Sequence, residues 1–355
     1  MTTLHVTNGD SVAGTLQTIV PSDEAVLPWG DVLHDGPVPG GIDAQALRNT
    51  RAKFLAESGW TTYELALADL AGRDAALAAM GAGDDVTLWF EPDLYDQLQL
   101  LQILARLYLR PRTERPLISI VACDELLGPL SAAQLAKYVE RQRMVREVDL
   151  ELAAQGWEAF TSSDDRLLQS FAGTETALFE ANSYKRDRSV VLPHMHSAIR
   201  RLLQEFPANT NGLSRTDQQT VNVLMNGAKT MSALYQAAHG PNEDLVWLGD
   251  SSYAWYVRRL MAGPVALVEF VATKRGASTP ATSEGVAAQP GFSSPPATGG
   301  AEFWAQPVQL TEAGRAVAEG RANAVLLNGI DRWIGGVHLQ RAAVSAEADS
   351  GASAF

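Results

Sequence analysis

Short apolar segments that alternate with stretches of helical periodicity are the feature that most constrains the fold of this chain. The apolar runs are short enough for buried strands and lie at residues 4–7, 25–29, 85–90 and 117–122. Helical spacing follows at residues 12–20, 43–58, 62–80, 94–109 and, after a possible N-cap at Ser131, 132–155. This alternation predicts an α/β domain, with a mostly parallel sheet and helices on both of its faces.

Length and composition limit the class of protein. With 355 residues the chain is expected to form about two domains. Hydrophobic residues make up 46% and charged residues 19%, which is a globular balance and excludes wholesale disorder. No apolar run reaches the ~18 residues that cross a bilayer, and the first residues lack a secretory signal pattern. Cys123 is the only cysteine, so no intrachain disulfide can form. We expect a cytoplasmic protein with no membrane partner.

The formal net charge of -13 is concentrated in the first half of the chain. Residues 1–180 contain 13 basic and 27 acidic side chains, residues 181–211 contain five and two, and residues 212–339 contain nine and ten. These steps predict an α/β domain at 1–180, a basic connecting segment at 181–211 and a second domain at 212–339. The acidic first domain is a poor general binder of nucleic acid, because phosphate contacts need lysine and arginine.

Polar side chains gather at the ends of the predicted strands. If the strands are parallel, their carboxyl ends share one edge of the sheet, which is where open α/β sheets bind ligands. The candidate catalytic residues on or after these strands are His5, Asp10, His34, Asp93 and Asp96. The candidate ligand-binding residues are Asn8, Ser11, Asp31, Asp35, Glu91 and Gln97.

Each of these clusters also has a structural interpretation. Asp10 or Ser11 could cap the following helix, and acidic residues near Asp93 could stabilise a helix N-terminus. His34 could act as a general base with a neighbouring aspartate, or join a metal site, although no metal-binding spacing is present. Cys123 has no neighbouring cation to activate it and is expected to be a buried structural residue. The sequence has no dinucleotide, P-loop or serine-hydrolase motif, so it indicates neither a cofactor nor a reaction.

The basic residues of the connecting segment lie at 184–188 and 194–201. They could bind phosphate, or they could pack across the acidic face of the first domain. We favour packing, because opposite charges would then meet at a joint.

The second half is predicted to be mainly helical. Ser214, Thr230 and Asp250 precede helical segments, a strand at 265–270 has a possible hairpin partner at 303–309, and a final helix opens near Thr311. This order resembles winged-helix domains. Its third helix carries Arg258 and Arg259, which are possible DNA contacts, although many such domains contact only proteins. The low-complexity stretches at 274–300 and 340–355 are predicted to be disordered.

Several motifs together resemble a bacterial family, the domain-of-unknown-function family 1835 (DUF1835). The residues that carry the resemblance are His5-x-x-Asn8-Gly9-Asp10-Ser11 and the segments 27–37, 88–98 and 327–338. No activity is established for this family, so the resemblance implies no mechanism. The polar, glycine-rich segment 328–338 is expected to fold back onto the first domain.

Three functions therefore compete. The first is a small-ligand-binding protein or enzyme with its site at the strand ends, and this is the one we favour. The second is a transcription-related adaptor whose winged helix contacts DNA or a protein. The third is a scaffold without chemistry.

Overall fold

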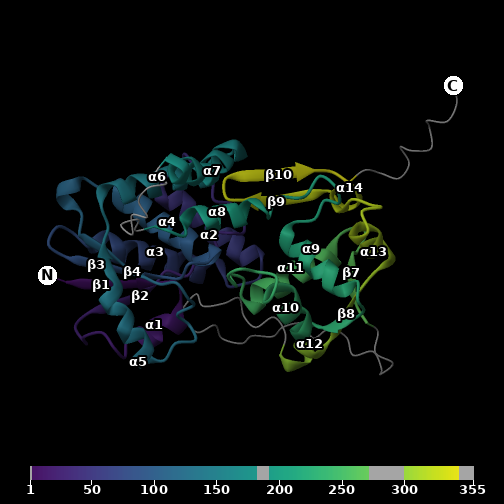
Figure 1. Ribbon diagram of the computed structural model, residues 1–355, viewed down its shortest axis with the longest axis horizontal. Helices are drawn as coiled ribbons and strands as arrows, with labels where there is room; N and C mark the ends of the chain where they lie inside the picture. The colour runs from purple at the N-terminus through teal and green to yellow at the C-terminus, as the bar shows by residue number, and fades with distance from the viewer. Residues whose placement is uncertain (1, 182–191, 272–299, 344–355) are drawn as a thin grey trace. The chain divides into compact units, whose positions relative to one another are not determined.

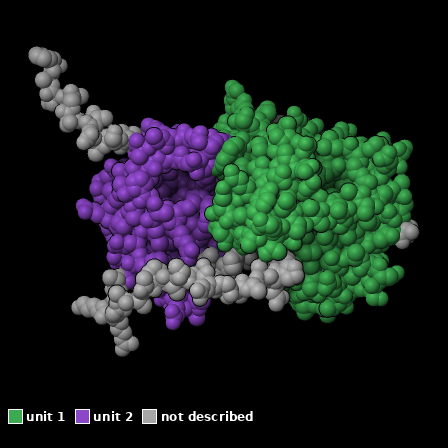
Figure 2. Space-filling view, turned by 180° about the vertical axis from the view of Figure 1, so that it is seen from behind, with its two compact units in different colours: residues 1–203, 289–293, 333–337 green, residues 204–288, 294–332, 338–355 purple. Residues whose placement is uncertain are grey.

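A computed structural model describes residues 2–181, 192–271 and 300–343. These residues form two compact units (Figure 2). Within the described ranges, unit 1 contains residues 2–181, 192–203 and 333–337, and unit 2 contains 204–271, 300–332 and 338–343. The division between residues 203 and 204 falls inside the segment 181–211. No helix in the described ranges is both long and apolar enough to cross a membrane.

Unit 1 is built on a five-stranded sheet with the order β2-β1-β3-β4-β5. Its strands are β1 (Thr3–Thr7), β2 (Ala25–Pro28), β3 (Asp85–Phe90), β4 (Leu117–Ala122) and β5 (Gln142–Met144). The first four are parallel, and β5 is antiparallel to β4. The prediction of an α/β fold with a mostly parallel sheet is confirmed.

Helices cover both faces of this sheet, with α1 and α5 on one side and α3 and α4 on the other (Figure 1). The helices of unit 1 are α1 (Asp10–Leu16), α2 (Ala44–Glu57), α3 (Tyr63–Ala79), α4 (Leu94–Tyr108), α5 (Ala132–Leu135), α6 (Glu147–Thr161), α7 (Asp165–Ala181) and α8 (Met195–Leu203), with the 3-10 turns η1 (Arg112–Glu114) and η2 (Ala136–Arg141). α4 is nearly enclosed, because even its glutamines at 97, 99 and 102 are buried.

The prediction of a single long helix over residues 132–155 is wrong. The chain leaves α5 after one turn, forms η2 and then contributes β5 to the edge of the sheet before α6 begins. β5 pairs antiparallel with residues 119–121 of β4. The Gln142 side chain also donates a hydrogen bond to Ser119 Oγ (2.6 Å), and the backbone N–H of Val145 donates to the carbonyl oxygen of Ile118 (2.9 Å). Pairing with β4 therefore outweighs the helical periodicity of this segment. The helix predicted over 12–20 is also shorter and ends at Leu16.

Unit 2 combines a group of helices with a small antiparallel sheet of order β6-β8-β7. Ser214 and Thr230 cap α9 and α10 through their side chains, as expected, whereas the cap position of α11 is Gly249 rather than Asp250. The elements are α9 (Arg215–Leu224), β6 (Lys229–Thr230), α10 (Met231–His239), α11 (Asp250–Ala262), β7 (Val268–Phe270), α12 (Ala301–Ala305), β8 (Pro307–Leu310), α13 (Glu312–Ala318) and α14 (Ala324–Asn328).

A hairpin of β9 (Ile330–Ile334) and β10 (Val337–Arg341) ends the described chain. Its tip, Trp333–Val337, belongs to unit 1. β10 extends two residues into the tail predicted at 340–355, and the rest of that tail after residue 343 lies outside the described residues. The insertion predicted at 274–300 also lies outside them, apart from Gly300.

Candidate functional site

In the sheet of unit 1, the order in which the chain adds strands reverses between β1 and β3. The chain places β2 on one side of β1, and β3 and β4 follow on the other side. In open α/β sheets the crevice at such a reversal, outside the carboxyl ends of the strands, is the usual ligand site. Here the residues at that position are Asn8 after β1 and the segment from Glu91 to Asp96 after β3.

Three carboxyl groups converge at this position. One oxygen atom from each of Glu91, Asp93 and Asp96 lies within 4.8 Å of the others. The three residues are only 6%, 3% and 0% exposed. We call them the carboxylate trio.

Local backbone geometry holds the trio in place. Asp93 is the N-cap of α4 and accepts a hydrogen bond from the backbone N–H of Asp96 (3.1 Å). Asp96 Oδ2 accepts from the N–H of Glu91 (2.6 Å), and its Oδ1 accepts from Asn8 Nδ2 (2.9 Å). Gln97 Nε2 donates to the carbonyl oxygen of Glu91 (2.7 Å). The structure therefore brings Asn8 and Gln97 to the trio as supporting residues.

Glu91 reaches the loop that follows β4. Its Oε1 accepts hydrogen bonds from the backbone N–H groups of Leu127 (2.6 Å) and Gly128 (3.1 Å). These two donors were not predicted from the sequence, because backbone donors carry no side-chain signature.

The trio favours bound protons. Burial raises the pKa of Asp93 well above its ordinary range, and the charge of Glu91 raises it further. Burial also raises the pKa of Asp96 well above that range, and the charges of Asp93 and Glu91 add to the effect. The pKa of Glu91 is raised mainly by burial. Among the described residues, no lysine or arginine lies within ion-pair distance of the trio.

The trio therefore needs protons or a bound cation to balance its charge. Carboxylate oxygens are hard ligands, so Glu91, Asp93 and Asp96 are the described residues that could hold a divalent metal ion. In the protonated state the same groups could act as general acids.

His34 and Asp35 lie on the loop after β2 and are also buried, at 1% and 0% exposure. His34 Nε2 is 3.6 Å from Asp35 Oδ2. The His34 ring packs edge-on against Tyr95, with 5.9 Å between ring centres. Tyr95 in turn donates a hydrogen bond to the carbonyl oxygen of Asn8 (3.4 Å), and burial raises its pKa. His34 is thus connected to the trio through Tyr95 and Asn8.

Asp31 pairs with two buried arginines. Its Oδ1 is 2.8 Å from Arg51 Nη2, and its Oδ2 is 3.3 Å from Arg73 Nη2. Burial alone would raise the pKa of Asp31, but the two arginines outweigh it and lower that pKa. Sequence reasoning missed both arginines. The only signal would have been their positions on otherwise apolar faces of predicted helices.

The remaining strand-end candidates make their contacts elsewhere in unit 1. His5 Nε2 is 2.7 Å from Glu24 Oε2, and His5 Nδ1 accepts a hydrogen bond from Trp89 Nε1 (3.0 Å). Asp10 is the first residue of α1. The pKa of Asp69 is raised mainly by burial, and the charge of Asp10 raises it further. The carbonyl oxygen of Ser11 accepts from Thr15 Oγ1.

Cys123 is buried at 3% exposure. Burial and the nearby acidic groups Glu91 and Asp96 raise the pKa of its thiol to about 12. The thiolate is therefore disfavoured, which agrees with a structural rather than a nucleophilic cysteine.

The described basic residues of the connecting segment, at 194–201, lie in unit 1. His194 Nε2 is 3.8 Å from Asp124 Oδ1, the His196 ring stacks on Phe171, and Arg200 donates to the carbonyl oxygen of Ala172. Residues 184–188 lie outside the described residues.

In unit 2, Arg258 and Arg259 both contact aromatic rings. The Arg258 guanidinium lies 4.9 Å from the ring centre of Phe303, and Arg259 lies over Trp255 and Tyr256. Arg259 Nη2 is also 3.6 Å from Asp217 Oδ2. Of the two, Arg258 is the more exposed.

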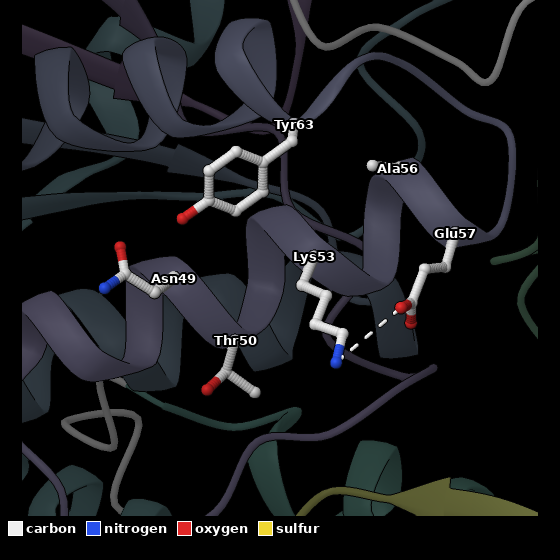
Figure 3. Close-up of a pocket in the computed structure, with 6 residues that line it drawn as sticks. All are labelled: Asn49, Thr50, Lys53, Ala56, Glu57 and Tyr63. Carbon is white, nitrogen blue, oxygen red and sulfur yellow. Dashed lines mark ion pairs between the residues drawn. The ribbon is translucent and has the colours of Figure 1, made fainter.

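A surface hollow of about 580 Å³ lies apart from these groups (Figure 3). It is lined by α2 and the start of α3, and its lining residues are Asn49, Thr50, Lys53, Ala56, Glu57 and Tyr63. Its charged groups form an ion pair within one helix, between Lys53 and Glu57 (3.7 Å). None of the predicted site residues lines it.

No protein-family model and no curated protein matches this chain. The resemblance to the DUF1835 family stays a prediction from the sequence motifs.

Proposed function

We propose that this chain is a cytoplasmic small-ligand-binding protein or enzyme, with an acidic site at the carboxyl ends of β1 and β3. The observation that carries the proposal is the buried carboxylate trio at the point where the strand order reverses. A fold gains no stability from bringing three carboxyl groups together in a buried place, so such an arrangement points to binding or chemistry.

The charge of the trio indicates what the ligand contributes. Each acidic group already accepts at least one hydrogen bond from the protein, so the site is built to hold oxygen atoms in fixed positions. A ligand that brings positive charge, such as a divalent cation or an amine, would replace the protons and remove the repulsion between the three groups. Without such a ligand, a protonated member of the trio can donate a proton to a substrate.

A thermal-shift titration with Mn²⁺ tests the cation arm, and a parallel titration with simple amines tests the other. Wild-type protein should be stabilised by about 2.7 kcal/mol when the free ligand reaches 100 times its Kd. Asp93→Asn should lose this stabilisation. Asp124→Asn is the matched control, because Asp124 follows the neighbouring strand but its side chain is 80% exposed.

If neither probe stabilises the wild type, and if Asp93→Asn and Asp96→Asn alter only the stability of the fold, the trio is structural. The third function, a scaffold without chemistry, would then replace this proposal.

A second proposal concerns unit 2, for which we infer a winged-helix-like adaptor. The support is the order α9, β6, α10, α11, β7, α12, β8 along the chain, together with the strand order β6-β8-β7. Most of α11, the helix that would enter a DNA groove, is buried, and Arg259 is paired with Asp217. These features favour a protein partner over DNA.

Fluorescence anisotropy with a mixed-sequence DNA duplex at low salt tests this preference. We expect no salt-dependent binding. Binding that weakens in Arg258→Ala, with a shallower dependence on salt, would favour DNA instead.

A further inference from the structure

The loop between β2 and α2 carries Asp31, His34 and Asp35. Asn8 and Arg51 hold the first half of this loop through hydrogen bonds. The backbone N–H of Gly30 donates to the carbonyl oxygen of Asn8 (3.1 Å). Arg51 donates to the carbonyl oxygens of Asp35 (2.7 Å) and Val32 (3.1 Å). Because Asn8 also holds Asp96, the start of this loop is joined to the carboxylate trio.

The second half of the loop is fixed by a segment almost 300 residues later. The backbone N–H of Val38 donates to the carbonyl oxygen of Gly335 (2.8 Å). The N–H of Gly336 donates to the carbonyl oxygen of Phe160 (2.9 Å), and the N–H of Gly40 donates to that of Thr161 (2.8 Å). Three backbone segments, from the loop, from the end of α6 and from the tip of the β9–β10 hairpin, are thereby joined.

The tip requires two glycines. A Cβ atom on Gly336 would lie 1.9 Å from the carbonyl oxygen of Thr161, and one on Gly335 would lie 2.2 Å from that of Phe160. Gly335 also has a φ of +58°, in the left-handed region that favours glycine. Ile334, which precedes the glycines, is fully buried. The backbone of the tip therefore lies so close to the end of α6 that only glycine fits at positions 335 and 336.

We propose that the glycine tip of the β9–β10 hairpin positions the loop that carries His34 and Asp35. The tip holds Val38, and Arg51 holds Val32 and Asp35. His34 lies between Val32 and Val38 in the chain, and its ring packs against Tyr95. The importance of this placement for ligand binding rests on the function proposed above, but the placement itself is independent of any ligand.

Hydrogen exchange and NMR on the full chain test the proposal without a ligand. In Gly336→Ala the amides of Val38 and Gly40 should exchange about tenfold faster or more, while amides of β1 and β3 keep their protection. The ring-proton shifts of His34 should move as its packing against Tyr95 changes. Gly72→Ala is the matched control, because Gly72 is exposed on α3 and a Cβ there meets no atom within 4 Å.

Two results would overturn the proposal. One is unchanged exchange at Val38 and Gly40 together with an unchanged His34 signal. The other is an equal loss of protection throughout unit 1, which would make the tip a general stabiliser. If Gly336→Ala does not fold, Ile334→Val serves as the milder variant, and the same local pattern is expected at smaller size. Mn²⁺ titration of the same proteins reports separately on the carboxylate trio, so failure of the two proposals can be told apart.

Discussion

Replacing Asp93 by asparagine removes one charge from the carboxylate trio while keeping the shape of the side chain. Asparagine is as good an N-cap as aspartate, and its Oδ1 can still accept the hydrogen bond from the N–H of Asp96. The new amide can donate to Glu91, as a protonated Asp93 would. The substitution therefore removes one titrating acid from the trio, together with the charge that helps to raise the pKa of Asp96.

The sign of the effect follows from the raised pKa of Asp93. Its folded-state pKa lies well above the ordinary value of 3.8, so the folded protein binds a proton that the unfolded chain releases. The stability due to this proton is fully present below the unfolded pKa and is lost as pH rises toward the folded one. One such proton changes the free energy of unfolding by about 1.4 kcal/mol per pH unit within that window.

We therefore expect Asp93→Asn to gain stability over the wild type as pH rises above about 4, by up to about 1.4 kcal/mol per unit within the window. Asp31 does not obscure this slope, because its pKa is lowered and its effect lies at lower pH. Urea midpoints measured with a chelator at half-unit steps from about pH 4.5 to about 7.5 provide the assay. Asp124→Asn is the control. A stability difference that is constant with pH, or that favours the wild type as pH rises, would refute the reasoning.

Two further substitutions test the packing around the site and in unit 2. Arg51→Met should lower the free energy of unfolding by about 3–5 kcal/mol in urea melts, because Asp31 stays buried with one cation fewer. Arg166→Met is the control and should leave the urea midpoint nearly unchanged, because the Arg166 side chain is 83% exposed. Gly314→Ala should cost about 1–3 kcal/mol or more, since its Cβ would lie 1.9 Å from a carbonyl oxygen just before β7. In Gly249→Ala the new Cβ meets no atom within 4 Å, so this variant should be better tolerated in the same urea melts. Equal losses in the two glycine variants would contradict the packing argument.

The meeting of Glu91, Asp93 and Asp96 could be anticipated from sequence. A buried strand followed by three acids within six residues places those acids at one strand end, and Asp93 is a recognisable N-cap. The contact of Asn8 with these acids could not be derived from the sequence, because the sequence does not show that β1 and β3 are neighbours. The pairing of β1 with β3 joins segments about 80 residues apart in the chain, so it leaves no local signal.

The role of Asp31 shows why the rest of the site could not be predicted. Asp31 and Asp93 are each the third residue after a strand, yet the partners of Asp31 are Arg51 and Arg73, which lie 20 and 42 residues further along. Ion pairs over such separations leave no periodic signal. The helix predicted over 132–155 failed for a related reason, since pairing of β5 with β4 is a tertiary interaction that overrides local periodicity.

The hairpin at residues 330–341 also has a consequence for the order in which the molecule is completed during synthesis. In unit 1 the backbone N–H of Val38 donates a hydrogen bond to the carbonyl oxygen of Gly335. In unit 2 the buried carboxylate of Glu205 pairs with Arg332 (3.2 Å). Ribosomes add about 5–20 residues per second, so Gly335 is synthesised roughly 15–60 s after Val38. Neither unit can reach its final set of contacts until Arg332 and Gly335 have been translated. A chain released before this hairpin would thus leave both units unfinished and open to quality control.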